Sequence, residues 1–242
     1  SVVRRLDGFN RHVSEALDLK SDLMIDNVSN IKVGIENVDV FLPNKNKDIL
    51  IKDCTIDLMK YQSLLIMGAS GVGKSTLLRT LAGLWPYAKG NVYLPKEEEF
   101  LFLPQRPYLP LGSLRQAISY PVVEEVISEK YSDEEIKEIL IACKLENLAD
   151  KLDIVDDWSR ILSLGEQQRI AFARILLYRP EFVFLDEATS ALDEDLEGNL
   201  YDMLKIHLPN TKIISIAHRS SLIAKHQAIL RLKEKGCWEI HE

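Results

Sequence analysis

Several features that mark special classes of protein are scarce in this sequence of 242 residues. Its 3 cysteines and 11 glycines are too few for a disulfide-dense scaffold or a collagen-like repeat. No stretch approaches the roughly 18–20 consecutive apolar residues of a membrane-spanning helix. The N-terminus also lacks the basic, apolar and small-residue pattern of a signal peptide. These absences predict a soluble chain.

Positive charge is also in deficit. The sequence has 30 Lys and Arg against 37 Asp and Glu, a formal net charge of −7. Broad surfaces that bind nucleic acid or anionic membranes use an excess of Lys and Arg. We therefore expect no nucleic-acid partner, and any polyanionic ligand must be held by local geometry rather than by overall charge.

The remaining composition is that of a folded protein in a reducing compartment. Cys54, Cys143 and Cys237 are odd in number and far apart, which argues against a disulfide framework or a zinc site. With 46% hydrophobic and 28% charged residues, the chain has enough apolar residues to form a core. Its length allows one large domain, or a core with a subdomain.

The first part of the chain differs from the rest. Residues 1–29 have scattered charge, no strand pattern and a weakly amphipathic helical character. We interpret them as a connector arriving from a preceding segment, and the alternative is a frayed terminus. The chain starts at Ser1 rather than at Met, which favours a piece of a longer protein.

From about residue 30, short apolar runs alternate with Gly, Pro or polar clusters. Four runs, 64–67, 100–103, 182–185 and 212–216, are apolar on both faces, which predicts buried strands of a parallel or mixed sheet. In open α/β sheets, ligands bind beyond the carboxyl ends of such strands. The residues that follow these runs are therefore the candidates for a site.

A helical stretch is predicted between the second and third of these runs, over about 112–178. Capping boxes start at Ser132 and Ser163, each with Glu three residues later, and Arg179-Pro180 ends the second helix. This pattern predicts a helical subdomain inserted into a core of about 30–111 and 179–242.

A phosphate-binding loop is predicted directly after the first strand. The sequence there fits G-x-x-x-x-G-K-[ST] and consists of Gly68, Ala69, Ser70, Gly71, Val72, Gly73, Lys74, Ser75 and Thr76. The glycines let backbone N–H groups point inward, and the next helix adds its positive N-terminus. Lys74 is expected to contact the β- and γ-phosphates and Ser75 to bind Mg²⁺. The alternative is an ordinary Gly-rich turn.

Two acidic residues follow the third strand. Asp186 is suited to a Mg²⁺ carboxylate, and Glu187 is suited to polarising a water beside the γ-phosphate. Either acid alone is more often a solvated strand end. Their combination with Lys74 favours the catalytic interpretation.

These motifs resemble the ATP-binding domain of ABC transporters. Leu162-Ser163-Leu164-Gly165-Glu166-Gln167-Gln168-Arg169 resembles the family's signature, Gln105 its Q-loop glutamine, Ser190–Asp193 its D-loop and His218 its switch histidine. The sequences of residues 81–86 and 103–112 are similar to those of one branch of the family. That branch holds the peroxisomal fatty-acyl transporters and the bacterial permease-ATPase fusions related to peptide and cobalamin uptake proteins. The resemblance covers about 30–240.

The resemblance implies an α/β fold with a P-loop NTPase (RecA-like) core, an inserted helical subdomain and a small antiparallel β subdomain. It implies an ABC ATPase domain over 30–242 that uses ATP and Mg²⁺ and lies at the cytoplasmic face of a membrane. The implied partners are a second copy in a head-to-tail homodimer and a transmembrane permease, fused N-terminally through 1–29.

Residue roles follow from the same resemblance. The implied catalytic residues are Glu187, His218 and Gln105, and the implied Mg²⁺ ligands are Ser75, Gln105 and Asp186. Beyond the loop 68–76, the implied nucleotide contacts are Phe41, Ser163, Gly165, Glu166 and Asp193.

Each of these roles has a plainer alternative. Ser163 with Glu166 can be a capping box alone, and Asp193 can be a helix N-cap. Gln105 can be a surface residue, and His218 a loop histidine. The sequence also departs from the family pattern, because Leu164 replaces the usual Gly of the signature and Leu42, next to Phe41, occupies the place of the adenine-stacking aromatic.

We expect the chain to be the ATP-hydrolysing motor domain of a membrane transporter. One alternative is a soluble ATPase of the same type that acts on nucleic acid or ribosomes, but such proteins usually carry a second ATPase domain, a coiled coil or basic patches. Another is a nucleotide-binding module without turnover, which would need Glu187 or His218 to be missing.

Overall fold

The computed structural model describes residues 23–26, 32–44, 48–96, 99–122 and 124–242. Most of the predicted connector, residues 1–22 and 27–29, lies outside the described residues. Among the described helices, none has the length and apolar character needed to cross a membrane.

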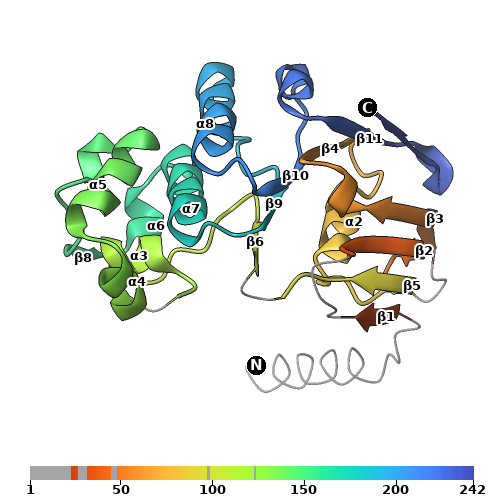
Figure 1. The fold of residues 1–242 in the computed structure, drawn as a ribbon, viewed down its shortest axis with the longest axis horizontal. Coiled ribbons are helices and arrows are strands. Elements are labelled where there is room, and N and C mark those ends of the chain that lie inside the picture. Colours follow the sequence, from red (N-terminus) through yellow and green to blue (C-terminus); the bar gives the residue numbers. More distant parts are fainter. Residues whose placement is uncertain (1–22, 27–31, 45–47, 97–98, 123) are drawn as a thin grey trace, which may run out of the picture.

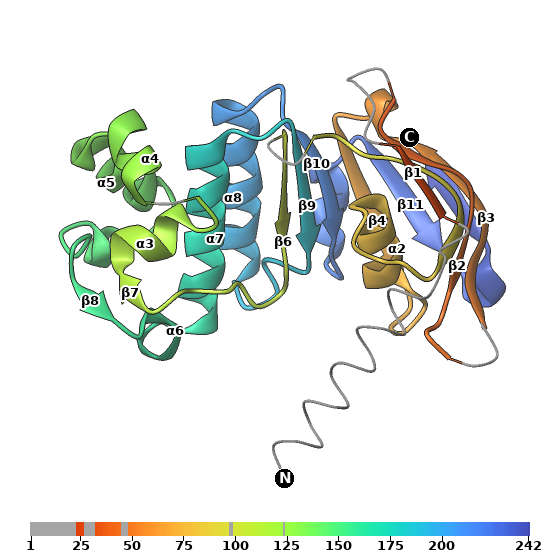
Figure 2. The same cartoon turned by 90° about the horizontal axis from the view of Figure 1, so that it is seen from below.

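A six-stranded sheet forms the centre of the molecule (Figures 1 and 2). Its strand order is β12-β11-β4-β10-β9-β6, and all neighbours are parallel except β11 and β12. The strands are β4 (Ser63–Gly68), β6 (Phe100–Leu103), β9 (Phe182–Asp186), β10 (Lys212–Ile216), β11 (Ala228–Leu232) and β12 (Trp238–His241). The four strands predicted from apolar runs are confirmed as four adjacent members of this sheet.

A second, four-stranded sheet has the order β1-β5-β2-β3. Its strands are β1 (Leu23–Asp26), β2 (Gly34–Phe41), β3 (Ile49–Asp57) and β5 (Ala88–Tyr93). Strand β2 is antiparallel to both β3 and β5, whereas β1 is parallel to β5.

Strand β1 lies within residues 1–29, where the sequence shows no strand pattern. It has only four residues, and Met24 and Ile25 are both exposed. A strand that short and that exposed lacks the period-2 alternation by which strands are recognised in sequence.

Helix α2 (Lys74–Leu81) lies between the two sheets (Figure 2). Its Leu77, Leu78 and Leu81 are fully buried. They pack with Val38 of the four-stranded sheet and Ile66 of the six-stranded sheet. Burial of each Leu side chain contributes about 2 kcal/mol, so this core fixes the phosphate-loop helix between the sheets.

The opposite face of the six-stranded sheet is covered by α7 and α8, with smaller helices beyond them (Figure 2). The remaining helices and short strands are β7 (Gly112–Ser113), α3 (Leu114–Ser119), α4 (Glu124–Lys130), α5 (Asp133–Ala142), β8 (Val155–Asp156), α6 (Trp158–Ile161), α7 (Leu164–Tyr178) and α8 (Glu194–His207). Short 3₁₀ helices are η1 (Leu58–Lys60), η3 (Glu146–Leu148), η4 (Ser220–Lys225) and η5 (Glu234–Gly236).

The helices α3 to α7 fall in the range 112–178 where the sequence predicts a helical region. Both predicted capping boxes are confirmed, at Ser132 for α5 and at Ser163 for α7. Helix α7 ends where Arg179 takes a left-handed conformation with φ of 49°. Pro180 follows it and cannot continue a helix.

A buried arginine joins α7 to the chain that follows β6. Arg174 donates to the carbonyl oxygens of Ala117 at 2.6 Å and Tyr108 at 2.8 Å, and its guanidinium lies 5.3 Å from the ring centre of Tyr120. Burial lowers the pKa of Arg174 to about 10. The side chain therefore stays charged at neutral pH and holds three segments together through hydrogen bonds to the backbone.

A buried chain of hydrogen bonds joins α8 to β10 and to the short 3₁₀ helix η4. The Tyr201 hydroxyl donates to Ser215 Oγ at 3.0 Å, and Ser215 Oγ lies 3.1 Å from His226 Nε2. His226 Nδ1 lies 2.8 Å from the carbonyl oxygen of Leu222. The neutral ring with its proton on Nδ1 satisfies all three bonds, and burial lowers the pKa of His226 to about 4.

We expect His226 to destabilise the fold in mild acid. Above pH 6.5 the residue is neutral in both states and has no effect. Below that pH the unfolded chain takes up the proton while the folded chain does not, until the pH falls to about 4. The free energy of unfolding should thus fall by about 2 kcal/mol between pH 6.5 and pH 5. Urea unfolding at several pH values measures this loss, and an unchanged pH slope in His226→Gln would contradict it.

Candidate functional site

The predicted phosphate loop is the turn from β4 to α2. Gly68 has φ of 153°, and a Cβ there would lie 2.6 Å from the carbonyl oxygen of Leu232. Gly73 has φ of 105° and is the N-cap of α2 without a side-chain cap. The first N–H groups of the helix are therefore left for an external acceptor, which is the arrangement that binds anions.

Lys74 lies within this loop and is almost fully buried. Its Nζ donates to the carbonyl oxygens of Gly68 at 3.0 Å and Ala69 at 2.9 Å. Burial lowers the pKa of Lys74, and the nearby carboxylates of Glu187 and Asp186 act in the opposite direction. The ammonium thus links the start of α2 to the end of β4. It can exchange these carbonyl oxygens for phosphate oxygens.

Ser75 and Asp186 meet where α2 begins and β9 ends. Ser75 Oγ donates to Asp186 Oδ1 at 2.6 Å, and Arg79 donates to Asp186 Oδ2 at 3.2 Å. A hydroxyl and a carboxylate are oxygen donors of the kind that Mg²⁺ takes.

This donor set fits Mg²⁺ better than other metals. In the described ranges no group of three or more His, Cys, Asp and Glu is placed to hold a metal ion. Mg²⁺ needs no such cage, since it is commonly held by one or two carboxylates together with substrate phosphates and water. One buried carboxylate beside a hydroxyl at an anion-binding loop is consistent with that mode.

Three predicted residues meet at the carboxyl ends of three adjacent strands. Glu187 follows β9, Gln105 follows β6 and His218 follows β10. His218 Nε2 lies 2.7 Å from Glu187 Oε1, and Gln105 Nε2 donates to Glu187 Oε2 at 3.3 Å. These residues are far apart in sequence, and the parallel pairing of β6 and β10 with β9 brings them together.

Glu187 is held in an unusual backbone conformation, with φ of 51°. Non-Gly residues in this region are uncommon and cluster at functional sites. Its N–H donates to the carbonyl oxygen of Ile216 at 3.2 Å, and its side chain is 23% exposed. A carboxylate oriented by an imidazole and an amide, and open to solvent, can accept a proton from a water molecule.

The signature residues start α7 and form the capping box that was the plainer alternative. Ser163 Oγ donates to Glu166 Oε2 at 2.7 Å and accepts from the Glu166 N–H at 3.3 Å. Asp193 similarly caps α8 by accepting from the N–H of Leu196 at 2.8 Å. Any contact of Ser163, Gly165, Glu166 or Asp193 with nucleotide stays a prediction.

The chain does not bring the signature residues to its own phosphate loop. Helix α7 lies across the six-stranded sheet from α2 (Figure 2). Ser163 is exposed at the start of α7.

The adenine contact predicted at Phe41 also stays a prediction. Phe41 ends β2, and its carbonyl oxygen accepts from Trp85 Nε1 at 3.2 Å. An open pocket borders the phosphate loop at 69–72 and is completed by Ile49, Leu50 and residues 233–236. Phe41 does not line it. Sequence reasoning missed these other lining residues, because no motif distinguishes them from ordinary strand and turn residues.

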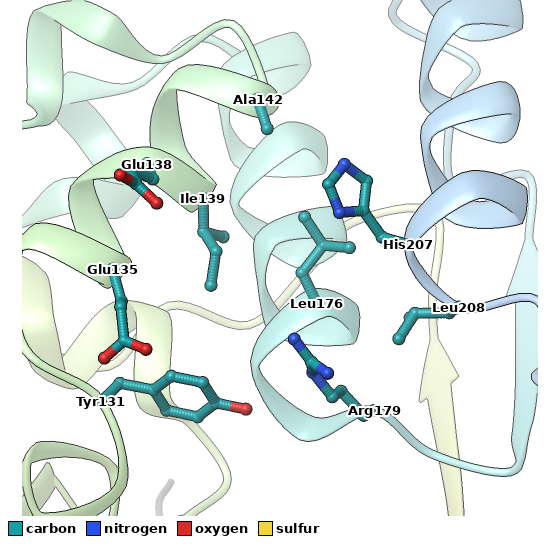
Figure 3. A pocket seen from close by; sticks show the side chains of 9 residues that line it. All are labelled: Tyr131, Glu135, Glu138, Ile139, Ala142, Leu176, Arg179, His207 and Leu208. Atoms are coloured by element: carbon teal, nitrogen blue, oxygen red, sulfur yellow. The ribbon is translucent and has the colours of Figure 1, made fainter.

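A further pocket lies between α5 and the ends of α7 and α8 (Figure 3). It is lined by Tyr131, Glu135, Glu138, Ile139, Ala142, Leu176, Arg179, His207 and Leu208. Two of its polar groups already serve the fold: the Tyr131 hydroxyl donates to the carbonyl oxygen of Leu177 at 2.7 Å, and Glu135 completes the capping box of Ser132. None of the predicted site residues lines this pocket.

A protein-family model and several curated proteins match this chain. Residues 51–190 match the family model described as ABC transporter. The chain is 50% identical over 191 residues to an uncharacterized ABC transporter ATP-binding protein of Haemophilus influenzae, covering 79% of this chain and 31% of that protein. It is 39% identical over 216 residues to the human lysosomal cobalamin transporter ABCD4, covering 85% of this chain and 35% of that protein.

Longer alignments extend over nearly the whole chain. ABC transporter D family member 1 of Arabidopsis thaliana is 33% identical over 259 residues, covering 99% of this chain and 19% of that protein. Among solved structures, a bacterial Atm1-family ABC exporter with ATP bound has a TM-score of 0.69 at 23% identity, covering 90% of this chain and 41% of that one, which shows the fold alone. The chain spans about a third of the length of the first of these relatives.

Proposed function

Because the chain belongs to the ABC transporter family, we propose that it binds and hydrolyses ATP to move a substrate across a membrane through an attached permease. ATP is the ligand that this family implies. The observation that carries the proposal is Glu187, held between His218 and Gln105 at the end of β9, next to the Ser75–Asp186 pair. The relatives are named as an ABC transporter ATP-binding protein and as a cobalamin transporter. These names support a transport function over a soluble ATPase acting on nucleic acid or ribosomes.

In this proposal each residue has a defined task. The N–H groups of the loop 68–76 and Lys74 hold the phosphates. Ser75, Asp186 and Gln105 would hold Mg²⁺, which when bound neutralises charge on the β- and γ-phosphates. Glu187 accepts a proton from the attacking water, and His218 orients the carboxylate through their 2.7 Å contact and can reach the γ-phosphate.

A second copy of the chain would complete the site in a head-to-tail homodimer. Within one chain the exposed start of α7 lies away from the phosphate loop (Figure 2). A helix start with an exposed Ser163 and N–H groups is suited to bind the γ-phosphate of a partner's nucleotide. Asp193, exposed at the start of α8, would then lie at the contact between the two copies.

The membrane partner would contact the helical region. Tyr108, Leu111 and Val155 are 60%, 75% and 73% exposed. Leu111 precedes β7 and Val155 lies in β8, and these strands pair antiparallel, so the two side chains belong to one small ribbon. Exposed apolar side chains gathered in this way mark interaction sites. We place this surface at the cytoplasmic face of a membrane, with residues 1–29 as the connector from a preceding transmembrane domain and 30–242 as the ATPase domain.

The test uses the full gene product in its native membrane or in a bilayer disc. Phosphate release from ATP should be measured with Mg²⁺ and after its removal with EDTA. We expect turnover only when Mg²⁺ is present, and no turnover under any condition would refute the proposed hydrolysis. Membrane segments counted in the full gene test the coupling separately, because their absence would favour a soluble ATPase or a separate permease subunit.

A further inference from the structure

Gln168 is a buried amide on α7 that no predicted role accounts for. It lies five residues after the N-cap Ser163 and is fully buried. Its Nε2 donates to the carbonyl oxygen of Gln105 at 2.9 Å and to Ser190 Oγ at 3.2 Å. Its Oε1 accepts from the N–H of Ala191 at 3.0 Å. Both N–H donors and the carbonyl of this amide are thus used.

The partners of Gln168 belong to the two segments that flank Glu187. Gln105 contacts Glu187 Oε2 through its own side chain and also donates to Ser190 Oγ at 3.5 Å. Ser190 and Ala191 follow Glu187 in the chain, and the Ser190 N–H donates to the carbonyl oxygen of Glu187 at 3.1 Å. The Gln168 side chain therefore links Gln105, after β6, to the turn after β9.

The same turn packs closely on the start of α7. A Cβ added at Gly165 would lie 3.4 Å from the carbonyl oxygen of Ala191 and 3.3 Å from Leu192 Cδ2. The backbone of α7 and the turn are therefore in near contact one turn before Gln168. Since a fully satisfied buried polar network gives a single rigid arrangement, a shift of α7 would displace Gln105 and Ser190 together.

We propose that Gln168 is a positioning residue for ATP hydrolysis, which holds Gln105 and the Ser190–Ala191 turn in place around Glu187. This inference rests on the proposed function. Glutamine is suited to the position because a single amide supplies two donors and one acceptor in a fixed plane. Methionine has a similar volume and flexibility but supplies none of these bonds.

Gln168→Met in the full gene product tests the inference. We expect kcat for ATP hydrolysis to fall about 10-fold or more, because small displacements of catalytic groups have effects of this size. The KM for ATP should stay within about twofold, since Gln168 contacts neither the phosphate loop nor Lys74 and the substitution acts on the positioned groups alone.

Gln62→Met is the matched control. Gln62 directly precedes β4, and its Nε2 donates to two backbone carbonyl oxygens, those of Pro209 at 2.9 Å and Thr211 at 2.8 Å. The substitution therefore removes a comparable number of amide hydrogen bonds at the amino ends of the central strands, away from Glu187. Its kcat should match that of the wild type, so a loss confined to Gln168→Met separates positioning from a general loss of amide hydrogen bonds.

Amide hydrogen exchange gives a readout that does not depend on turnover. The Ala191 N–H is bonded to Gln168 Oε1, so its exchange in the protein without nucleotide should be about 10-fold faster or more in Gln168→Met. Exchange at Ala191 should be unchanged in Gln62→Met. Should Gln168→Met fail to fold, Gln168→Glu keeps the shape and the acceptor but replaces the donor to Gln105, and its kcat should also fall.

The outcomes separate this inference from the proposed function. A normal kcat in Gln168→Met or Gln168→Glu, with Glu187→Gln inactive, overturns the role of Gln168 alone. An equal loss in Gln62→Met also overturns it. Absence of Mg²⁺-dependent turnover in the wild type refutes the proposed function, and this inference with it.

Discussion

Replacing Glu187 by Gln is expected to reduce steady-state ATP hydrolysis by about 10²-fold or more. The amide has the size of the carboxylate but cannot accept a proton from water. Lys74, the cation of the phosphate loop, donates to the carbonyl oxygens of Gly68 and Ala69 and not to Glu187. ATP affinity should therefore stay within a few-fold of the wild type, and a dimer formed on ATP binding should persist because it is no longer resolved by hydrolysis.

The measurements are phosphate release for turnover, calorimetric titration for ATP affinity and size-exclusion chromatography with ATP for the dimer. Glu194→Gln is the matched control. This substitution makes the same change from carboxylate to amide, but in an exposed residue at the start of α8. It should hydrolyse ATP at the wild-type rate. Wild-type turnover in Glu187→Gln would remove Glu187 from the mechanism.

The central strands could be predicted because their signal is local. Residues 182–185 are apolar without interruption, and the structure buries all of them. A strand covered on both faces has to be apolar throughout, so the prediction required no knowledge of its neighbours. The capping boxes at Ser132 and Ser163 are local in the same way, because both partners lie within four residues.

The grouping of Gln105, Glu187 and His218 needed more than local pattern. Sequence placed each after a strand, and only the resemblance to a known family placed them in one site. The structure gives the physical reason, which is that β6 and β10 are the two parallel neighbours of β9. Strand order is set by tertiary packing over long sequence separations.

Gln168 and Arg174 show what could not be predicted. In sequence both are polar residues within a helix, where a solvated face is the ordinary expectation. Their burial follows from the packing of α7 on the chain after β6, which supplies the carbonyl oxygens of Gln105 and Tyr108 as partners. Every residue has a backbone carbonyl, so the sequence of the accepting segment does not indicate which carbonyl oxygen will accept the hydrogen bond.

Lys74→Met is expected to weaken ATP binding by about 10²-fold or more. The ammonium is the cation inside the phosphate loop, and charge-assisted hydrogen bonds to phosphate contribute about 1.5–3 kcal/mol each. Two such bonds correspond to a factor of about 10² or more in the dissociation constant. Because binding is measured without turnover, calorimetric titration of ATP gives the result directly.

The same substitution should leave the fold nearly as stable as before. Lys74 is almost fully buried, so holding its ammonium in the loop has a desolvation cost that methionine does not have. That gain offsets the loss of hydrogen bonds to the carbonyl oxygens of Gly68 and Ala69, and we expect a change within about 1 kcal/mol. Lys89→Met, at an exposed position of β5, is the control and should bind ATP as the wild type does. Wild-type affinity in Lys74→Met would mean that the loop holds phosphate through its N–H groups alone. A loss of folding stability as large as the loss of binding free energy would mean that Lys74 mainly stabilises the fold.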